Sequence, residues 1–390
     1  MKAGVQLVAS SGLTLLLVTG MSVLTALLLG PEEFGLYAAF QAVAVLMLPL
    51  VSLRLETRVA VCTTDVELNE LSTALTSLTL VFLAVVMAAP LFLWPWVDGL
   101  SAVLVALLAV GMLLADFGLS RLAFMERHGA LAVYRFVRQV LPVALALCVA
   151  KVSPQHEHVL VALIAGTWIW ALVLGWPQAG QSVWSWPLVQ KVWRHHRAGL
   201  QASIALGGLN GLWLNGLQPL MAWLGWHQLA GQYALLQRLI NAPLSVLTVV
   251  VNSLLLAKGN DLHKRRSLVL QVCAGLALLG LVWAVCLWGL LFVQPYWSVP
   301  VQWLPDQDFF YAAAVFGVCS FAVGTVSVVS VRLADEWFVA GWQLLFMLVW
   351  VLALFVADLE HVFSGLLLMG GLAYGVLLWR WLNLIPAKDV

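Results

Sequence analysis

Charged side chains are scarce in this sequence: they make up 9% of its 390 residues, whereas a soluble domain carries roughly 25%. The 19 lysines and arginines nearly balance the 18 acidic residues, so a basic surface for nucleic acid is not expected. The five cysteines are scattered, without a Cys-x-x-Cys pair or a zinc-ligand spacing. These absences argue against a soluble domain, a disulfide framework and a metal site, and no cofactor is expected.

Long apolar runs dominate instead. A bilayer core needs about 20 apolar residues per helix. Twelve runs approach or exceed that length: 5–29, 37–53, 71–97, 100–120, 131–150, 159–176, 199–224, 233–257, 267–293, 309–331, 337–357 and 362–379. Backbone groups in lipid must pair within their own segment, and the runs do not alternate as barrel strands do. We therefore expect an all-α, polytopic membrane protein, whose first run is a retained helix because no cleavage site follows it.

The distribution of lysine and arginine predicts the orientation. With the N-terminus inside, nearly all of these residues fall in cytoplasmic loops, and the outer loops hold only Lys151. The outer loops carry acidic residues instead. We expect both termini in the cytoplasm.

This orientation is testable with reporter fusions. Fusions after Gln155 and Gln302 should report the outer side, and fusions after Gly129 and Gln190 the cytoplasm. Swapped signals at two successive loops would contradict the number of helices in that half of the chain.

A heptad, Gly-x-Tyr-Ala-x-x-Gln, occurs twice, at Gly35–Gln41 and Gly231–Gln237, about half the chain apart. A Leu-Gly pair precedes each copy. Two related bundles that rock around a shared site are typical of transporters. We therefore expect an N-terminal six-helix bundle at 1–176 and a C-terminal six-helix bundle at 199–390. The cytoplasmic linker between them, 177–198, could contain an amphipathic helix that begins at Pro187.

Arg238 follows the second heptad, where the first copy has Ala42. Charge at this depth in a membrane helix is costly and is often functional. The candidate substrate-binding residues are Arg238, Asn241, Asn215, Gln218, Gln41 and Gln237. One interpretation is a polar pocket in which Arg238 faces an anionic group. The other is an arginine that snorkels or pairs internally.

Weaker candidates lie near the inner ends of other spans. Four arginines could receive an anionic headgroup or could merely follow the positive-inside rule: Arg54, Arg58, Arg135 and Arg138. Asp116, with Glu56, could couple transport to an ion, or Asp116 could pair with Arg121.

Three stretches resemble the polysaccharide and oligosaccharide flippases of the multidrug/oligosaccharidyl-lipid/polysaccharide export superfamily: Leu29–Ala38, Ser52–Glu56 and Ala230–Leu244. The resemblance implies two six-helix bundles around a central cleft that opens alternately to either side of a bacterial inner membrane. The implied substrate is an oligosaccharide repeat unit on undecaprenyl pyrophosphate, exported for surface polysaccharide such as O-antigen or exopolysaccharide. Arg238 would face its phosphate, and a polysaccharide polymerase would be a partner.

Two other functions stay open. A drug or metabolite exporter of the same superfamily would share the architecture and differ in the lining of its cavity. A membrane glycosyltransferase or polysaccharide polymerase, the less favoured alternative, could use the outer acids Glu32, Glu33, Asp306 and Asp308. The favoured interpretation is a transporter that is not an enzyme.

Overall fold

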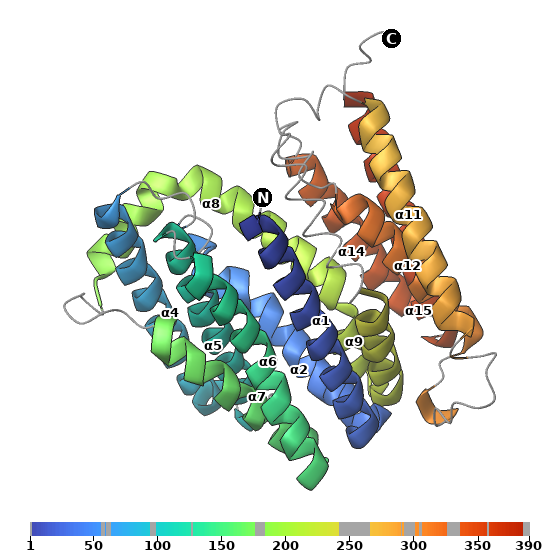
Figure 1. Cartoon of the computed structure of the whole chain (residues 1–390), viewed down its shortest axis with the longest axis horizontal. Helices are drawn as coiled ribbons and strands as arrows, with labels where there is room; N and C mark the ends of the chain where they lie inside the picture. Colours follow the sequence, from blue (N-terminus) through green and yellow to red (C-terminus); the bar gives the residue numbers. More distant parts are fainter. Residues whose placement is uncertain are drawn as a thin grey trace. The chain divides into compact units, whose positions relative to one another are not determined.

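The computed structural model describes residues 2–55, 59, 64–93, 99–125, 128–175, 184–241, 266–289, 291, 301–303, 306–325, 336–356 and 359–384. These residues are almost entirely helical, and no strand occurs among them (Figure 1). The all-α fold predicted from the apolar runs is confirmed.

The helices, in chain order, are α1 (Lys2–Leu29), α2 (Pro31–Ser52), α4 (Asp65–Leu93), α5 (Gly99–Phe124), α6 (His128–Val152), α7 (His156–Trp170) with a π-helical extension (Ala171–Gly175), α8 (Trp186–Asn215), α9 (Leu217–Trp223), a helix at 227–241, α11 (Arg266–Trp288), α12 (Gln307–Thr325), α14 (Glu336–Val356) and α15 (Leu359–Leu384). Within the described residues, eight helices are long and apolar enough to cross a membrane. Two shorter apolar helices, Thr14–Leu29 and Trp337–Val349, coincide with two further predicted spans. The chain is a multi-pass membrane protein.

The described residues form two compact units. One is Gly20–Gly231, and the other combines Met1–Thr19 with Gln232–Val390. The bundles expected from the duplication, 1–176 and 199–390, have a different boundary, and that division stays a prediction. The linker between them is partly helical. As predicted, a helix begins beside Pro187, but it continues as α8 to Asn215, so 186–198 is the first part of a long helix.

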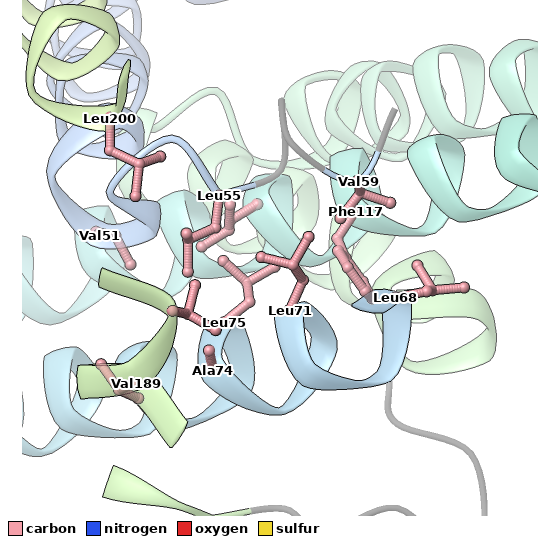
Figure 2. Packing of buried hydrophobic residues seen from close by; sticks show 12 residues of the cluster. Val51, Leu55, Val59, Leu68, Leu71, Ala74, Leu75, Phe117, Val189 and Leu200 are labelled. Atoms are coloured by element: carbon pink, nitrogen blue, oxygen red, sulfur yellow. The ribbon is translucent and has the colours of Figure 1, made fainter. Parts of the chain in front are cut away.

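A hydrophobic cluster holds α2, α4, α5 and α8 together in the Gly20–Gly231 unit. Figure 2 shows Val51 and Leu55 of the α2 end against Leu71 and Leu75 of α4, with Leu200 of α8 nearby. All five side chains are buried. This cluster fixes the C-terminal end of α2 against α4 and α8.

Helix α4 buries hydroxyl groups as well as apolar side chains. Ser72, Thr76, Ser77 and Thr79 each donate a hydrogen bond to the carbonyl four residues earlier, over 2.7–2.9 Å. This local bonding satisfies the hydroxyl without a partner helix. The Ser77 hydroxyl also accepts the Ser185 N–H at 3.0 Å, which fixes the chain where it enters α8.

In the other unit, α12 packs against α11 and α15. The 227–241 helix joins this unit through close contacts. The Trp283 indole donates to the Leu239 carbonyl at 2.9 Å, and a Cβ on Gly317 would lie 2.7 Å from Ile240 Cγ2. Most of this helix is buried, including every residue from Ala230 to Leu236.

The internal repeat is visible in the backbone. Gly30 and Gly225, from the two Leu-Gly pairs, have nearly the same positive φ, 81° and 83°, a conformation that favours glycine. A helix follows each of them: α2 begins directly after Gly30, and the 227–241 helix begins after Trp226. The two copies of the heptad therefore begin from the same kind of turn.

The first glycines of the two heptads also touch each other. A Cβ on Gly35 would clash with the His227 carbonyl oxygen, and one on Gly231 would clash with the Pro31 carbonyl oxygen. Each glycine thus meets the carbonyl four residues before the other glycine. This reciprocal contact, which we call the glycine crossing, is possible only without side chains at both positions.

Replacing either glycine by alanine should destabilise the protein. We expect Gly35→Ala and Gly231→Ala each to cost about 1–3 kcal/mol, because the added methyl group meets a backbone carbonyl that cannot rotate away. The measurement is the thermal unfolding midpoint of purified protein. Gly208→Ala is the matched control, since a Cβ there meets nothing within 4 Å. Equal midpoints for all three variants would contradict the close crossing.

Candidate functional site

Three of the candidate polar residues lie on helices that pack together in the Gly20–Gly231 unit. Gln41 is on α2, Asn215 ends α8 and Gln218 is on α9, and α2 contacts both α8 and α9. Gln218 is 7% exposed, whereas Gln41 and Asn215 are partly exposed. The Asn215 amide donates to the Gly211 carbonyl at 3.3 Å. A polar region shared by these three side chains stays a prediction.

A break in the helix separates Asn215 from Gln218. Helix α8 ends at Asn215, Gly216 follows, and α9 starts at Leu217. Gly211, Gly216 and Pro219 lie in this span, and glycine and proline favour such an interruption of a membrane helix. Polar residues beside a discontinuous helix are a common arrangement at transporter binding sites, because the freed backbone groups can also bind.

Arg238 lies on the 227–241 helix with Gln237 and Asn241, and all three side chains are partly exposed. Arg238 and Gln237 each interact with other residues, so the arginine is not an isolated charge. These three residues belong to the Gln232–Val390 unit, whereas Gln41, Asn215 and Gln218 belong to the other. A single pocket that joins both sets stays a prediction.

Arg54 directly follows the C-terminal end of α2 in a strained backbone. Leu53 and Arg54 both have positive φ, 48° and 60°, a conformation that costs energy in residues with side chains. The Ser52 hydroxyl supports the turn by accepting the Arg54 N–H at 3.0 Å. The Arg54 guanidinium lies against α8, where a Cβ on Gly207 would be 3.1 Å from Nε. Arg58 and Glu56 lie outside the described residues.

Asp116 of α5 forms an ion pair with Arg138 of α6, with 2.5 Å between Oδ1 and Nη1. The alternative partner considered from the sequence, Arg121, is not the one that the structure shows. Arg121 is 8% exposed near the end of α5, and Arg135 is partly exposed on α6. Because Asp116 and Arg138 engage each other, an ion or a headgroup would have to compete with that pair.

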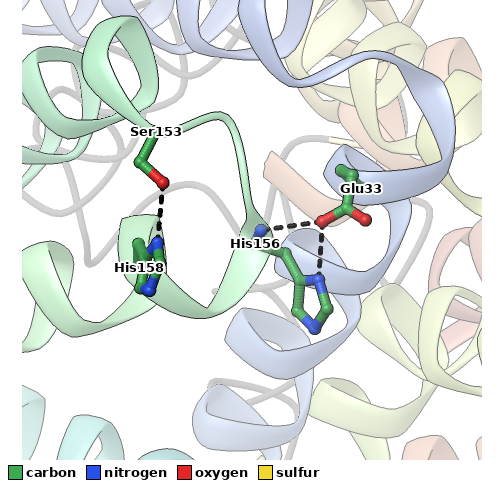
Figure 3. A network of polar contacts seen from close by, with 4 residues as sticks. All are labelled: Glu33, Ser153, His156 and His158. Carbon is green, nitrogen blue, oxygen red and sulfur yellow. Dashed lines mark hydrogen bonds and ion pairs between the residues drawn. The ribbon is translucent and has the colours of Figure 1, made fainter.

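Sequence reasoning missed a polar cluster at the N-terminal ends of α2 and α7. Glu33 accepts hydrogen bonds from both the backbone N–H and the ring Nδ1 of His156, while Ser153 pairs with His158 (Figure 3). The available signal was the pair of histidines at 156 and 158 in a loop predicted to be outside.

A second charged region lies where α4 and α8 begin. A cavity of about 830 Å³ is lined there by Glu67, Glu70, Lys191, Arg194, His195 and His196, among others. Lys191 and Glu70 form an ion pair with 2.5 Å between Nζ and Oε1. Among the described residues no group of three or more His, Cys, Asp or Glu could hold a metal ion.

Comparison with known proteins identifies the fold. The MATE multidrug transporter DinF-BH, solved in complex with a ligand, aligns with a TM-score of 0.57 and 12% identity over 99% of this chain and 96% of that one. A solved structure named "protein A" aligns with a TM-score of 0.57 and 14% identity over 99% and 97%. The eukaryotic MATE transporter AtDTX14 aligns at a TM-score of 0.41 with 15% identity over 98% and 91%.

No protein-family model matches the sequence, and no curated protein matches it. The structural comparison therefore shows the fold of the chain. The chain is a membrane protein with the fold of the MATE transporters.

The Asp116–Arg138 pair can be tested by a double-mutant cycle. Asp116→Asn and Arg138→Gln should each lower the unfolding midpoint, because each leaves an uncompensated charge. The loss of stability in the double variant should be smaller than the summed losses of the two single variants, with a coupling energy of about 0.5–3 kcal/mol. Additive effects would show that the pair contributes nothing, and would leave Asp116 free for ion coupling.

Proposed function

We propose that this protein flips lipid-linked oligosaccharide repeat units, carried on undecaprenyl pyrophosphate, from the inner to the outer leaflet by alternating access. The observation that carries the proposal is Arg238, a partly exposed arginine on the helix of the second heptad, between Gln237 and Asn241. The MATE transporter fold and the resemblance of three sequence stretches to flippases support it.

The chemistry of the cargo fits an arginine. A pyrophosphate and a sugar chain cannot cross hydrocarbon unaided, because burying their polar groups without partners is costly. The planar fork of donors in a guanidinium suits phosphate oxygens in a way that a single ammonium does not. Arg238 would hold the pyrophosphate.

The sugar needs different partners. Amide side chains both donate and accept hydrogen bonds, as sugar hydroxyls do. Gln41, Asn215 and Gln218 supply three amides on helices that contact one another, and the break at Gly216 adds backbone groups. In this proposal these residues contact the glycan.

The proposed setting is a bacterial inner membrane, with both termini in the cytoplasm. The loops that carry most of the lysine and arginine are placed on the cytoplasmic side in this proposal, because cytoplasmic loops of membrane proteins are rich in these residues. The product, a repeat unit facing outward, would be the substrate of a polysaccharide polymerase, which makes such an enzyme the expected partner.

A drug exporter is the second candidate, and the likeness to a multidrug transporter favours it. A cavity that binds cationic drugs would be expected to hold a carboxylate. Asp116, the acid that the sequence places deepest in a span, is paired with Arg138, which makes it less available to a cationic drug. Export of a cationic fluorescent dye from cells that express the protein would favour this alternative.

Replacing Arg238 tests the flippase proposal. Arg238→Ala should abolish export of surface glycan while the amount of folded protein stays near normal, because a lost charge-assisted contact costs about 1.5–3 kcal/mol, or roughly tenfold to a hundredfold in affinity. Arg238→Lys should keep partial function, since a charge remains without the fork. The measurement is surface glycan per molecule of folded protein in the membrane.

Arg380→Ala is the matched control. The Arg380 guanidinium stacks on the Phe338 ring at 3.9 Å, so its loss should lower stability without changing export per molecule. Wild-type export per molecule in the Arg238→Ala variant would end the proposal that this residue binds phosphate.

A further inference from the structure

The first turns of α8 have one apolar face and one polar face. Val189, Val192 and Leu200 are buried in the hydrophobic cluster that α8 shares with α4. The side chains on the opposite face are polar and exposed: Gln190, Lys191, Arg194, His195 and Arg197. A helix with this pattern packs its apolar face against the core and presents the charged face to its surroundings.

Helix α4 runs antiparallel to these turns of α8. The Ser185 N–H donates to the Ser77 hydroxyl at 3.0 Å. Further along α8, Lys191 pairs with Glu70, which lies closer to the start of α4, with 2.5 Å between Nζ and Oε1. The charged side chains of the two helices therefore meet near the N-terminal end of α4, a helix long and apolar enough to cross a membrane.

The cavity of about 830 Å³ at this place is lined by residues of both helices. Its lining contains two carboxylates, Glu67 and Glu70, and two cationic side chains, Lys191 and Arg194. Apart from two histidines, the formal charges of the lining cancel. A simple anion would meet the carboxylates, and a simple cation would meet Lys191 and Arg194. The lining therefore suits a ligand that carries a positive and a negative charge close together.

Exposed tryptophans lie where α8 begins. Trp184 is 52% exposed and Trp186 is 44% exposed, and Pro187, the next residue, lines the cavity. Tryptophan is enriched where the hydrocarbon of a bilayer meets the headgroups. The charged lining and these tryptophans at the end of a membrane span indicate that phospholipid headgroups surround the cavity.

We propose that this cavity binds the headgroup of a phospholipid that carries a primary ammonium beside its phosphate, as phosphatidylethanolamine does. The ammonium donates hydrogen bonds to the carboxylates of Glu67 and Glu70. The phosphate accepts hydrogen bonds from Arg194, whose planar donors fit phosphate oxygens. The inference goes beyond the proposed transport function and does not depend on it.

The lining also distinguishes between two common headgroups. Phosphatidylcholine has the same phosphate, but its ammonium carries three methyl groups and cannot donate a hydrogen bond to a carboxylate. A quaternary ammonium is instead recognised by a cage of aromatic rings. Among the described residues that line the cavity there is no Trp, Tyr or Phe. We therefore expect the cavity to prefer phosphatidylethanolamine.

Native mass spectrometry of the full-length protein in detergent measures this preference. The delipidated protein is titrated with phosphatidylethanolamine or with phosphatidylcholine of the same acyl chains. Phosphatidylethanolamine should bind about tenfold more tightly, because it alone forms the charge-assisted hydrogen bonds to the carboxylates. Equal affinity for the two lipids would overturn the proposal. This comparison uses the wild-type protein, so it is decisive even if a variant fails to fold.

Two variants test the two charges of the headgroup separately. Glu67→Gln should weaken the binding of phosphatidylethanolamine about tenfold and leave that of phosphatidylcholine unchanged, because only the ammonium loses a partner. Arg194→Gln should weaken both lipids, because they share the phosphate. Asp65→Asn and Arg197→Gln are the matched controls, since they change exposed charges on the same two helices outside the cavity lining.

Both controls should bind the lipids as the wild type does, and all four variants should unfold at the wild-type temperature in detergent without added lipid. Wild-type lipid binding in both Glu67→Gln and Arg194→Gln would exclude this cavity as the site. Inorganic phosphate is the competitor that tests the source of the anion. It should not displace phosphatidylethanolamine at an equal concentration, and displacement would show a site for free anions and overturn the assignment to a lipid.

Discussion

A chain in hydrocarbon must satisfy its backbone hydrogen bonds within its own segments, and this constraint determines most of the structure. It makes the described residues helical, and it removes the hydrophobic effect as the force that holds one helix against another. Close packing must replace that force. The glycine crossing, where the backbones of α2 and the 227–241 helix touch at Gly35 and Gly231, is the closest such contact described. Gly207 and Gly211 likewise let α8 approach Leu46 of α2 and Arg54, which follows the end of α2.

Features that depend on length and local chemistry could be predicted from the sequence. The apolar runs predicted the helices because span length is fixed by the bilayer. The start of α8 at Pro187 followed from the preference of proline for a first turn. The start of α2 was predicted six residues late, at 37 instead of Pro31. Glu32 and Glu33 suggested a loop, yet proline and acids are favourable in a first helical turn.

The candidate site was less predictable because its contacts join distant segments. Asp116 was expected either to couple an ion or to pair with Arg121 on the same helix, whereas the structure pairs it with Arg138 on the next one. Nothing local predicts that Glu33 would cap a helix more than a hundred residues later. The repeated heptad was the exception. The sequence matched Gly35 with Gly231, and in the structure these two glycines meet at the closest contact between their helices.

Polar side chains in this protein find partners in two ways, within one helix or between two helices. The hydroxyls of α4 bond to their own helix, so they are satisfied whether or not that helix moves. Glu33 with His156, and Asp116 with Arg138, are satisfied only across two helices. Separating those helices leaves charge without a partner unless a proton, an ion or water replaces it. Alternating access requires helices to separate repeatedly. If the protein works by the proposed alternating access, these interhelical pairs would have to break wherever the helices that they join separate.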